Sequence, residues 1–254
     1  MSTIPSTVLI SGGASGLGEA TARRFSADGW HVAILDRDGD RARSVAAELG
    51  DAAAIQVDVT DADAVDAAVA AVVAEGHTLR LAVSCAGIGP PQRLLSRRGP
   101  HPVEAFHTIL AVNLFGTFHV LRAAAMAMAE NELDEDGQRG AIVNTASIAA
   151  YDGQIGQVAY AASKGGIVGM TLPAARDLAD RFIRVCTIAP GLFRTPLLAS
   201  LPQEAQDSLG ASVPNPARLG EPAEYAALVA HIASNPMLNG EVIRLDGALR
   251  MAPR

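Results

Sequence analysis

The 254-residue sequence contains one lysine, two cysteines and one tryptophan, and aromatic residues make up only 4% of it. The two cysteines, Cys85 and Cys186, are too few for a disulfide framework, and both lie in apolar runs. We therefore expect free thiols in a reducing compartment. Basic residues are also outnumbered, 20 against 27 acidic ones, for a net charge of -7. Because nucleic-acid binders usually carry a basic excess, this class of function is not indicated.

Long hydrophobic runs and metal-binding motifs are missing as well. No stretch approaches the length needed to cross a bilayer, and Met1–Thr7 carry no basic segment of the kind that begins a secretion signal. We expect a soluble, cytoplasmic protein. The six histidines are scattered without His-x-x-x-His or Cys-x-x-Cys spacing, so no metal is expected. Neither a Gly-x-Ser-x-Gly elbow nor a Gly-Lys-Ser phosphate loop occurs.

What the sequence does contain is a regular alternation of short apolar runs and longer Ala-rich amphipathic stretches. The runs predict strands at Thr7–Ser11, His31–Asp36, Ala53–Asp58, Leu79–Ser84, Gly140–Ser147, Ile183–Ala189 and Glu241–Leu245. The stretches predict helices at Gly16–Asp28, Asp61–Glu75, Pro102–Glu130, Gln157–Asp180 and Glu221–Ser234. Such alternation predicts an α/β fold: a single doubly wound, Rossmann-type domain over residues 1–254, with a mostly seven-stranded parallel sheet and helices on both faces.

Two irregular, proline-containing segments interrupt this rhythm. Residues 88–102 follow the fourth predicted strand, and residues 190–220 follow the sixth. Loops after the carboxyl ends of parallel strands border the ligand crevice of a doubly wound sheet. We therefore expect these two segments to form the rim and the lid of a substrate site.

A glycine cluster, Ser11–Gly18, lies between the first strand and the first helix. Glycines allow positive φ and close approach of the backbone to a pyrophosphate, and a helix N-terminus offers free N–H groups. Asp36 closes the second strand, where a carboxylate can bind the ribose hydroxyls of NAD and repel the 2′-phosphate of NADP. Arg37 could instead bind that phosphate, but the acidic residue at the strand end favours NAD. Asp58 either reaches the adenine or is a charge before the next helix.

Three residues have the spacing of a proton-transfer site. Tyr160 and Lys164 are four residues apart in a helical pattern and so share one face, while Ser147 ends the preceding strand. Apart from the histidines, all other basic side chains in the protein are arginines, so the single ammonium is expected to have a task that a guanidinium performs badly. A nearby ammonium should favour the phenolate and lower the pKa of the tyrosine, and a serine hydroxyl can hold the substrate oxygen. The alternatives are a surface Tyr–Lys pair and a helix-capping serine.

Asn113 stands in an otherwise apolar helical stretch, and a buried amide needs partners. It either holds a water that relays protons from Lys164 or caps a helix kink.

These residues resemble those of the short-chain dehydrogenases/reductases. Ser11 stands where that family usually has Thr, and Ser84-Cys85-Ala86-Gly87 replaces its Asn-Asn-Ala-Gly. The resemblance implies a catalytic tetrad of Ser147, Tyr160, Lys164 and Asn113. It also implies that an NAD site is lined by Gly12, Ser15, Gly16, Leu17, Gly18, Asp36, Asp58, Val59, Cys85, Ala86, Gly87, Tyr160, Lys164, Pro190, Gly191, Phe193 and Thr195.

Four tracts sharpen the resemblance: Gly12–Ala22, Gln138–Leu178, Ile183–Pro202 and Asn239–Met251. They resemble family members that oxidise 3-hydroxyacyl-CoA, which implies a short-chain acyl-CoA substrate and a homotetramer. Other possibilities are a 3-oxoacyl-carrier-protein reductase, a steroid or alcohol dehydrogenase, and a non-catalytic NAD-binding scaffold. The match is weaker over 88–107 and 203–218, and the arginines of the first stretch are either solvated or contact CoA phosphates. They are Arg93, Arg97 and Arg98.

Overall fold

The fold is built on one parallel sheet of seven strands in the order β3-β2-β1-β4-β7-β8-β9. The structure is a computed structural model and describes residues 6–199 and 202–253. The first five residues, where no targeting segment is expected, and Ser200 and Leu201 of the predicted lid lie outside the described residues. The strands are β1 (Ser6–Ser11), β2 (His31–Asp36), β3 (Ala52–Gln56), β4 (Thr78–Ser84), β7 (Gly140–Thr145), β8 (Ile183–Pro190) and β9 (Val242–Leu245). The predicted fold class is confirmed.

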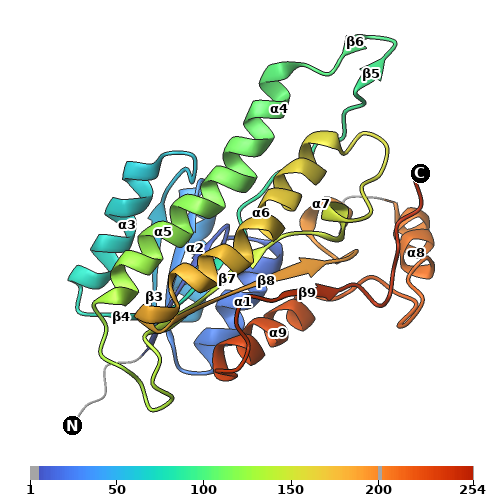
Figure 1. The fold of residues 1–254 in the computed structure, drawn as a ribbon. Coiled ribbons are helices and arrows are strands. Elements are labelled where there is room, and N and C mark those ends of the chain that lie inside the picture. The colour runs from blue at the N-terminus through green and yellow to red at the C-terminus, as the bar shows by residue number, and fades with distance from the viewer. Residues whose placement is uncertain (1–5, 200–201, 254) are drawn as a thin grey trace.

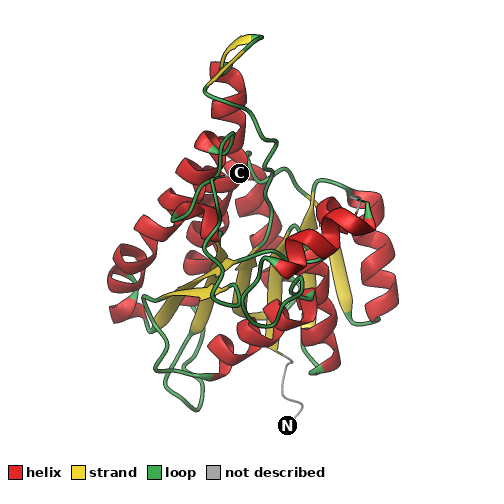
Figure 2. Cartoon of the chain, turned by 90° about the vertical axis from the view of Figure 1, so that its right-hand side faces the viewer, coloured by secondary structure: helices red, strands yellow, loops and turns green. Residues whose placement is uncertain are grey.

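Helices cover both faces of this sheet (Figures 1 and 2). The larger ones are α1 (Gly16–Ala27), α2 (Gly39–Leu49), α3 (Ala62–Ala74), α4 (Val103–Leu110), α5 (Gly116–Ala129), α6 (Val158–Asp177), α8 (Gln203–Ala211) and α9 (Pro222–Ser234). Short turns are η1 (Ala111–Phe115), η2 (Ile148–Ala150), η3 (Ala179–Arg181) and α7 (Pro196–Ala199). Alternate residues of each strand point to opposite faces, so Leu9 packs with α3 and α5 while Val8 and Ile10 pack with α1 and α9.

The order of the strands fixes the position of the ligand crevice. From β1 the chain first builds outward through β2 and β3, and then returns to pair β4 with the other edge of β1. The segments that follow β1 and β4 therefore run toward opposite edges of the sheet, and a crevice opens outside the carboxyl ends of these two strands.

Several predicted boundaries were wrong. Strand β3 ends at Gln56 and β7 at Thr145, so Asp58 and Ser147 lie in the loops beyond the strands. Helix α2 was not predicted, although its apolar positions have helical spacing and the carboxylate of Asp38 accepts the N–H of Arg41 at its start. The predicted rim contains a hairpin of β5 (Leu95–Ser96) and β6 (Gly99–Pro100), which projects beyond α4 (Figure 1).

The continuous helix Val103–Ala129 contradicts the expectation that no apolar stretch approaches the length of a membrane span. Among the described residues it is long and apolar enough, by length and composition alone, to cross a membrane, with a mean hydropathy of 1.5 over its best window. Half of that window is buried inside the protein, where Val120 and Met128 contribute to the core. Core helices of globular proteins meet the same criterion, so this finding is weak support for a membrane span.

Candidate active site

The glycine cluster forms a tight turn that only glycine can build. A Cβ on Gly18 would lie 2.1 Å from the carbonyl oxygen of Gly12, and one on Gly12 would lie 2.6 Å from the backbone nitrogen of Ala86. Gly12 also has a φ of +67°, in the left-handed region that glycine favours. The turn brings Ser15–Gly18 to the edge of a cavity at the start of α1, where backbone N–H groups lack helical partners. This geometry fits a dinucleotide pyrophosphate.

Asp36 is held beside the turn by two backbone groups. Its carboxylate accepts the N–H of Ala14 at 3.1 Å and that of Asp38 at 3.0 Å. Arg37 lines the same cavity, so both groups that bear on a 2′-phosphate are present. Asp58 also lines the cavity, and its carboxylate accepts the backbone N–H and the hydroxyl of Thr60, which hold its pKa below the usual value. Helix α3 is capped by Asp61 instead, which leaves Asp58 facing the cavity.

The cavity has a volume of about 780 Å³ and is lined by every residue that the family resemblance assigned to the cofactor. Ser147 lies on its wall with Tyr160 and Lys164, so the three residues of the proton-transfer pattern meet at the crevice. Leu192, Leu198 and Leu209 of the predicted lid line it as well. The predicted placement of Tyr160 and Lys164 on one helix face is also found, since both project from α6 into this cavity.

The electrostatics of the pair differ from expectation. Burial raises the pKa of the Tyr160 phenol, and a hydrogen bond with the Ser147 hydroxyl only partly opposes it. The Lys164 ammonium lies 5.7 Å from the centre of the tyrosine ring and donates to the carbonyl of Thr145 at 2.8 Å, so burial outweighs the lowering that was expected from its charge. Lys164 is itself only 4% exposed, and burial lowers its pKa to about 8.

Asn113 lies behind the cavity wall, in the wide turn η1 between α4 and α5, and is fully buried. Its carbonyl accepts the N–H of Ile88 at 2.8 Å, while its amide donates to the carbonyl of Ile88 at 2.9 Å and to the hydroxyl of Ser163 at 3.0 Å. The side chain therefore fastens the segment after β4 to α6. The next residue along, Gly89, packs against the ring of Tyr160. Neither sequence-based reading of Asn113 included this latch.

Thr145 is a site residue that the sequence analysis missed. It is the last residue of β7, lines the cavity, and provides the carbonyl to which Lys164 donates. The sequence gives no signal for this role, because any residue at that position would offer a carbonyl.

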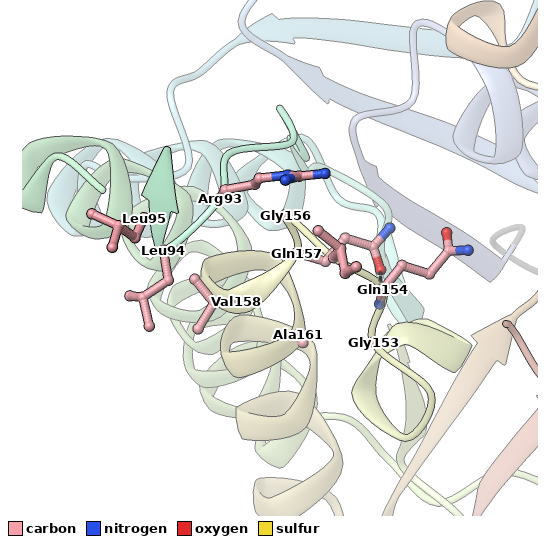
Figure 3. Close-up of a pocket in the computed structure, with 10 residues that line it drawn as sticks. Arg93, Leu94, Leu95, Gly153, Gln154, Gly156, Gln157, Val158 and Ala161 are labelled. Carbon is pink, nitrogen blue, oxygen red and sulfur yellow. Dashed lines mark hydrogen bonds between the residues drawn. The ribbon is translucent and has the colours of Figure 1, made fainter. Parts of the chain in front are cut away.

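The three arginines of the predicted rim separate in the structure. Arg93 lines a second, smaller groove of about 440 Å³, in which it extends over the loop toward Gln157 (Figure 3). Gln157 and Gln154 belong to both cavities, so the groove continues from the main site. Arg97 and Arg98 instead form the exposed turn of the hairpin.

With this geometry in place, comparison with known proteins defines the class. A family profile described as short chain dehydrogenase matches residues 6–206, and the chain belongs to this family of nicotinamide-dependent oxidoreductases. The expected family and its class of cofactor are thereby confirmed.

The chain is particularly similar to 3-hydroxyacyl-CoA dehydrogenase type-2 of Drosophila melanogaster, with 52% identity covering 96% of this chain and 97% of that protein. The crystal structure of the protein of the same name from Mycobacterium avium superimposes with a TM-score of 0.94 at 46% identity, covering 98% of this chain and 97% of that one. A 3-ketoacyl-(acyl-carrier-protein) reductase from Brucella melitensis, complexed with NADH, gives a TM-score of 0.86 at 32% identity, covering 98% and 100%.

Proposed function

We propose that this protein interconverts 3-hydroxyacyl-CoA and 3-oxoacyl-CoA with NAD as the cofactor. The observation that carries the chemistry is the convergence of Ser147, Tyr160 and Lys164 on the cavity that the glycine turn and Asp36 border. The substrate class is supported by the relatives of that name, which match nearly the whole chain.

The reaction needs a proton at oxygen and a hydride at carbon to move together. When bound, the nicotinamide ring supplies or accepts the hydride. In the reducing direction the Tyr160 hydroxyl gives its proton to the carbonyl oxygen, while the Ser147 hydroxyl donates a hydrogen bond to the same oxygen. The Lys164 ammonium favours the phenolate that remains until solvent returns the proton.

The raised pKa of Tyr160 sets the pH dependence of the two directions. A neutral phenol is the form that donates a proton, so reduction of the ketone is favoured near neutral pH. Oxidation of the alcohol needs the phenolate, which becomes more abundant as the pH increases. We therefore expect the oxidation rate to increase with pH above neutrality, up to the point where Lys164 loses its charge.

The groove at Arg93 supports an acyl-CoA over a smaller alcohol. It offers one guanidinium, the amides of Gln154 and Gln157, and the apolar side chains of Leu94 and Val158, which lie along one wall in Figure 3. A phosphopantetheine arm carries a phosphate, amides and short alkyl segments, and so matches these groups.

The deciding experiment measures NADH oxidation with acetoacetyl-CoA, with the same ketone on acyl-carrier protein, and with a steroid ketone, each repeated with NADPH. We expect acetoacetyl-CoA with NADH to be preferred and Tyr160→Phe to be inactive while it still binds NADH. Arg93→Ala should raise the Michaelis constant for acetoacetyl-CoA, whereas the Arg97→Ala/Arg98→Ala pair serves as a matched control with little effect. A preference for the carrier-protein substrate would favour the reductase, which the Brucella relative supports. Inactivity with every ketone would favour a scaffold.

Two further features belong to the proposal. We propose a homotetramer, supported by large apolar side chains exposed on η1, α5 and α6, namely Phe115, Phe118, Met126 and Leu172. Sedimentation of the wild type and of Phe118→Glu tests it, since a monomeric wild type would contradict it. We also propose the cytoplasm as the location, supported by Cys85 and Cys186 as free thiols, and localisation of the tagged protein in cells tests it.

A further inference from the structure

The position of the Lys164 ammonium depends on one backbone carbonyl. Within residues 6–199 and 202–253, its one hydrogen bond runs to the carbonyl oxygen of Thr145, at 2.8 Å. Thr145 ends β7, and the chain leaves the sheet directly after it on the way to Ser147. Any freedom in Thr145 would therefore move both the lysine and the approach to the serine.

The side chain of Thr145 is fixed from the opposite face of the sheet. Tyr225 projects from α9 and is fully buried, and its phenol oxygen lies 2.7 Å from the hydroxyl of Thr145. Cys85, at the end of the neighbouring strand, completes a small polar cluster, with its sulfur 3.6 Å from both oxygens. The contact joins residues 80 positions apart in the sequence.

The hydroxyl of Tyr225 is unusual because the ring that carries it belongs to an apolar cluster. The ring packs among aliphatic side chains that include Ile188, Val229 and Ile232. A phenylalanine would bury the same ring without the cost of desolvating a hydroxyl, so packing alone does not explain the tyrosine. The oxygen is accounted for by its contacts with Thr145 and Cys85.

We propose that Tyr225 is a positioning residue of the active site: through the hydroxyl of Thr145 it fixes the carbonyl that holds the Lys164 ammonium. The inference rests on the proposed function only for the role of Lys164 in turnover. The chain of contacts runs from α9, through the end of β7, to α6, and so ties the two faces of the sheet together at the reacting residues.

The single lysine of this protein permits a direct test. Protein grown with 13C-labelled lysine gives one side-chain signal, and its shift against pH reports the pKa of Lys164 without substrate or cofactor. Besides the ring of Tyr160, the ionisable group that acts on the ammonium is Cys85, which raises the lysine pKa against the larger effect of burial. In the wild type we expect a midpoint of about 8.

Tyr225→Phe removes only the hydroxyl. A less well-placed carbonyl stabilises the charged lysine less, so we expect the midpoint to move down by about half a pH unit, and the alkaline limb of kcat/KM to move with it. Thr145→Val should reproduce the shift, Thr145→Ser should not, and the double variant Tyr225→Phe/Thr145→Val should move the midpoint no further than either single change.

A matched control is Thr171→Val, which breaks another buried hydroxyl pair, that of Thr171 and Thr187 at 2.6 Å, and leaves the hydroxyls of Tyr225 and Thr145 in place. We expect it to lower the melting temperature and leave the lysine titration unchanged. The proposal is overturned if Tyr225→Phe behaves like this control, with lower stability and an unshifted lysine signal. Because the titration needs no substrate, failure of the proposed reaction would leave the result readable.

Discussion

Asn113→Ala tests whether this amide is a latch or a proton relay. The change removes three hydrogen bonds, two to the backbone of Ile88 and one to the hydroxyl of Ser163. At about 1 kcal/mol for each bond, and because Asn113 is fully buried, we expect a loss of about 3 kcal/mol in the free energy of unfolding. Turnover should also decrease, because the freed segment 88–89 no longer supports the ring of Tyr160.

The assay compares urea unfolding at one fixed protein concentration with turnover of acetoacetyl-CoA. Asn131→Ala is the control, because the amide of Asn131 likewise fastens two backbone carbonyls, those of Leu79 and Arg139, far from the cavity. It should lose about 2 kcal/mol of stability and keep its turnover. If Asn113→Ala unfolds like the wild type but no longer turns over, the latch is refuted and a relay of protons from Lys164 is favoured.

Two other substitutions test the charges of the site: one should stabilise the fold, and the other should change the preference for NADH over NADPH. The pKa of Lys164 is about 8 in the folded protein, against an ordinary value of 10.5. Below pH 8 the buried charge therefore lowers the free energy of unfolding by about 3 kcal/mol. This cost disappears as the pH rises from 8 to 10.5, because in that range the unfolded chain binds more protons than the folded protein. Lys164→Met should therefore be inactive but about 2 kcal/mol more stable than the wild type at pH 7. In urea titrations this gain in stability should vanish near pH 10, and an equal gain at pH 7 and pH 10 would refute the reasoning. Asp36→Ala, with Arg37 intact, should raise the ratio of kcat/KM for NADPH over NADH on the order of 10- to 100-fold, since a like charge near the phosphate is removed; an unchanged ratio would assign the preference to other residues.

The sequence was sufficient for features that are encoded locally. Strands β1, β2 and β4 were predicted to within a residue or so at each end, because continuous apolar runs bounded by turns depend on neighbours in the chain. The glycine turn, Asp36 and the Tyr160–Lys164 spacing could be recognised for the same reason, and all of them reach the cavity. The boundaries of β3 and β7 were placed too late, since hydrogen bonding to the adjacent strands decides where a strand ends.

Other features depended on contacts between distant segments. The raised pKa of Tyr160 follows from the burial of its side chain, and the spacing of residues along α6 carries no information about burial. Asn113 was singled out as a buried amide, but its partner Ile88 lies 25 residues away and meets it only because η1 packs under the loop after β4. The contact of Tyr225 with Thr145 needs the register of β7 and the docking of α9 together. Local patterns thus determined most of the strands and helices and the chemical groups of this protein, while the tertiary structure alone decided the ends of some strands and the partners of the side chains, because hydrogen bonding and desolvation depend on distances in space.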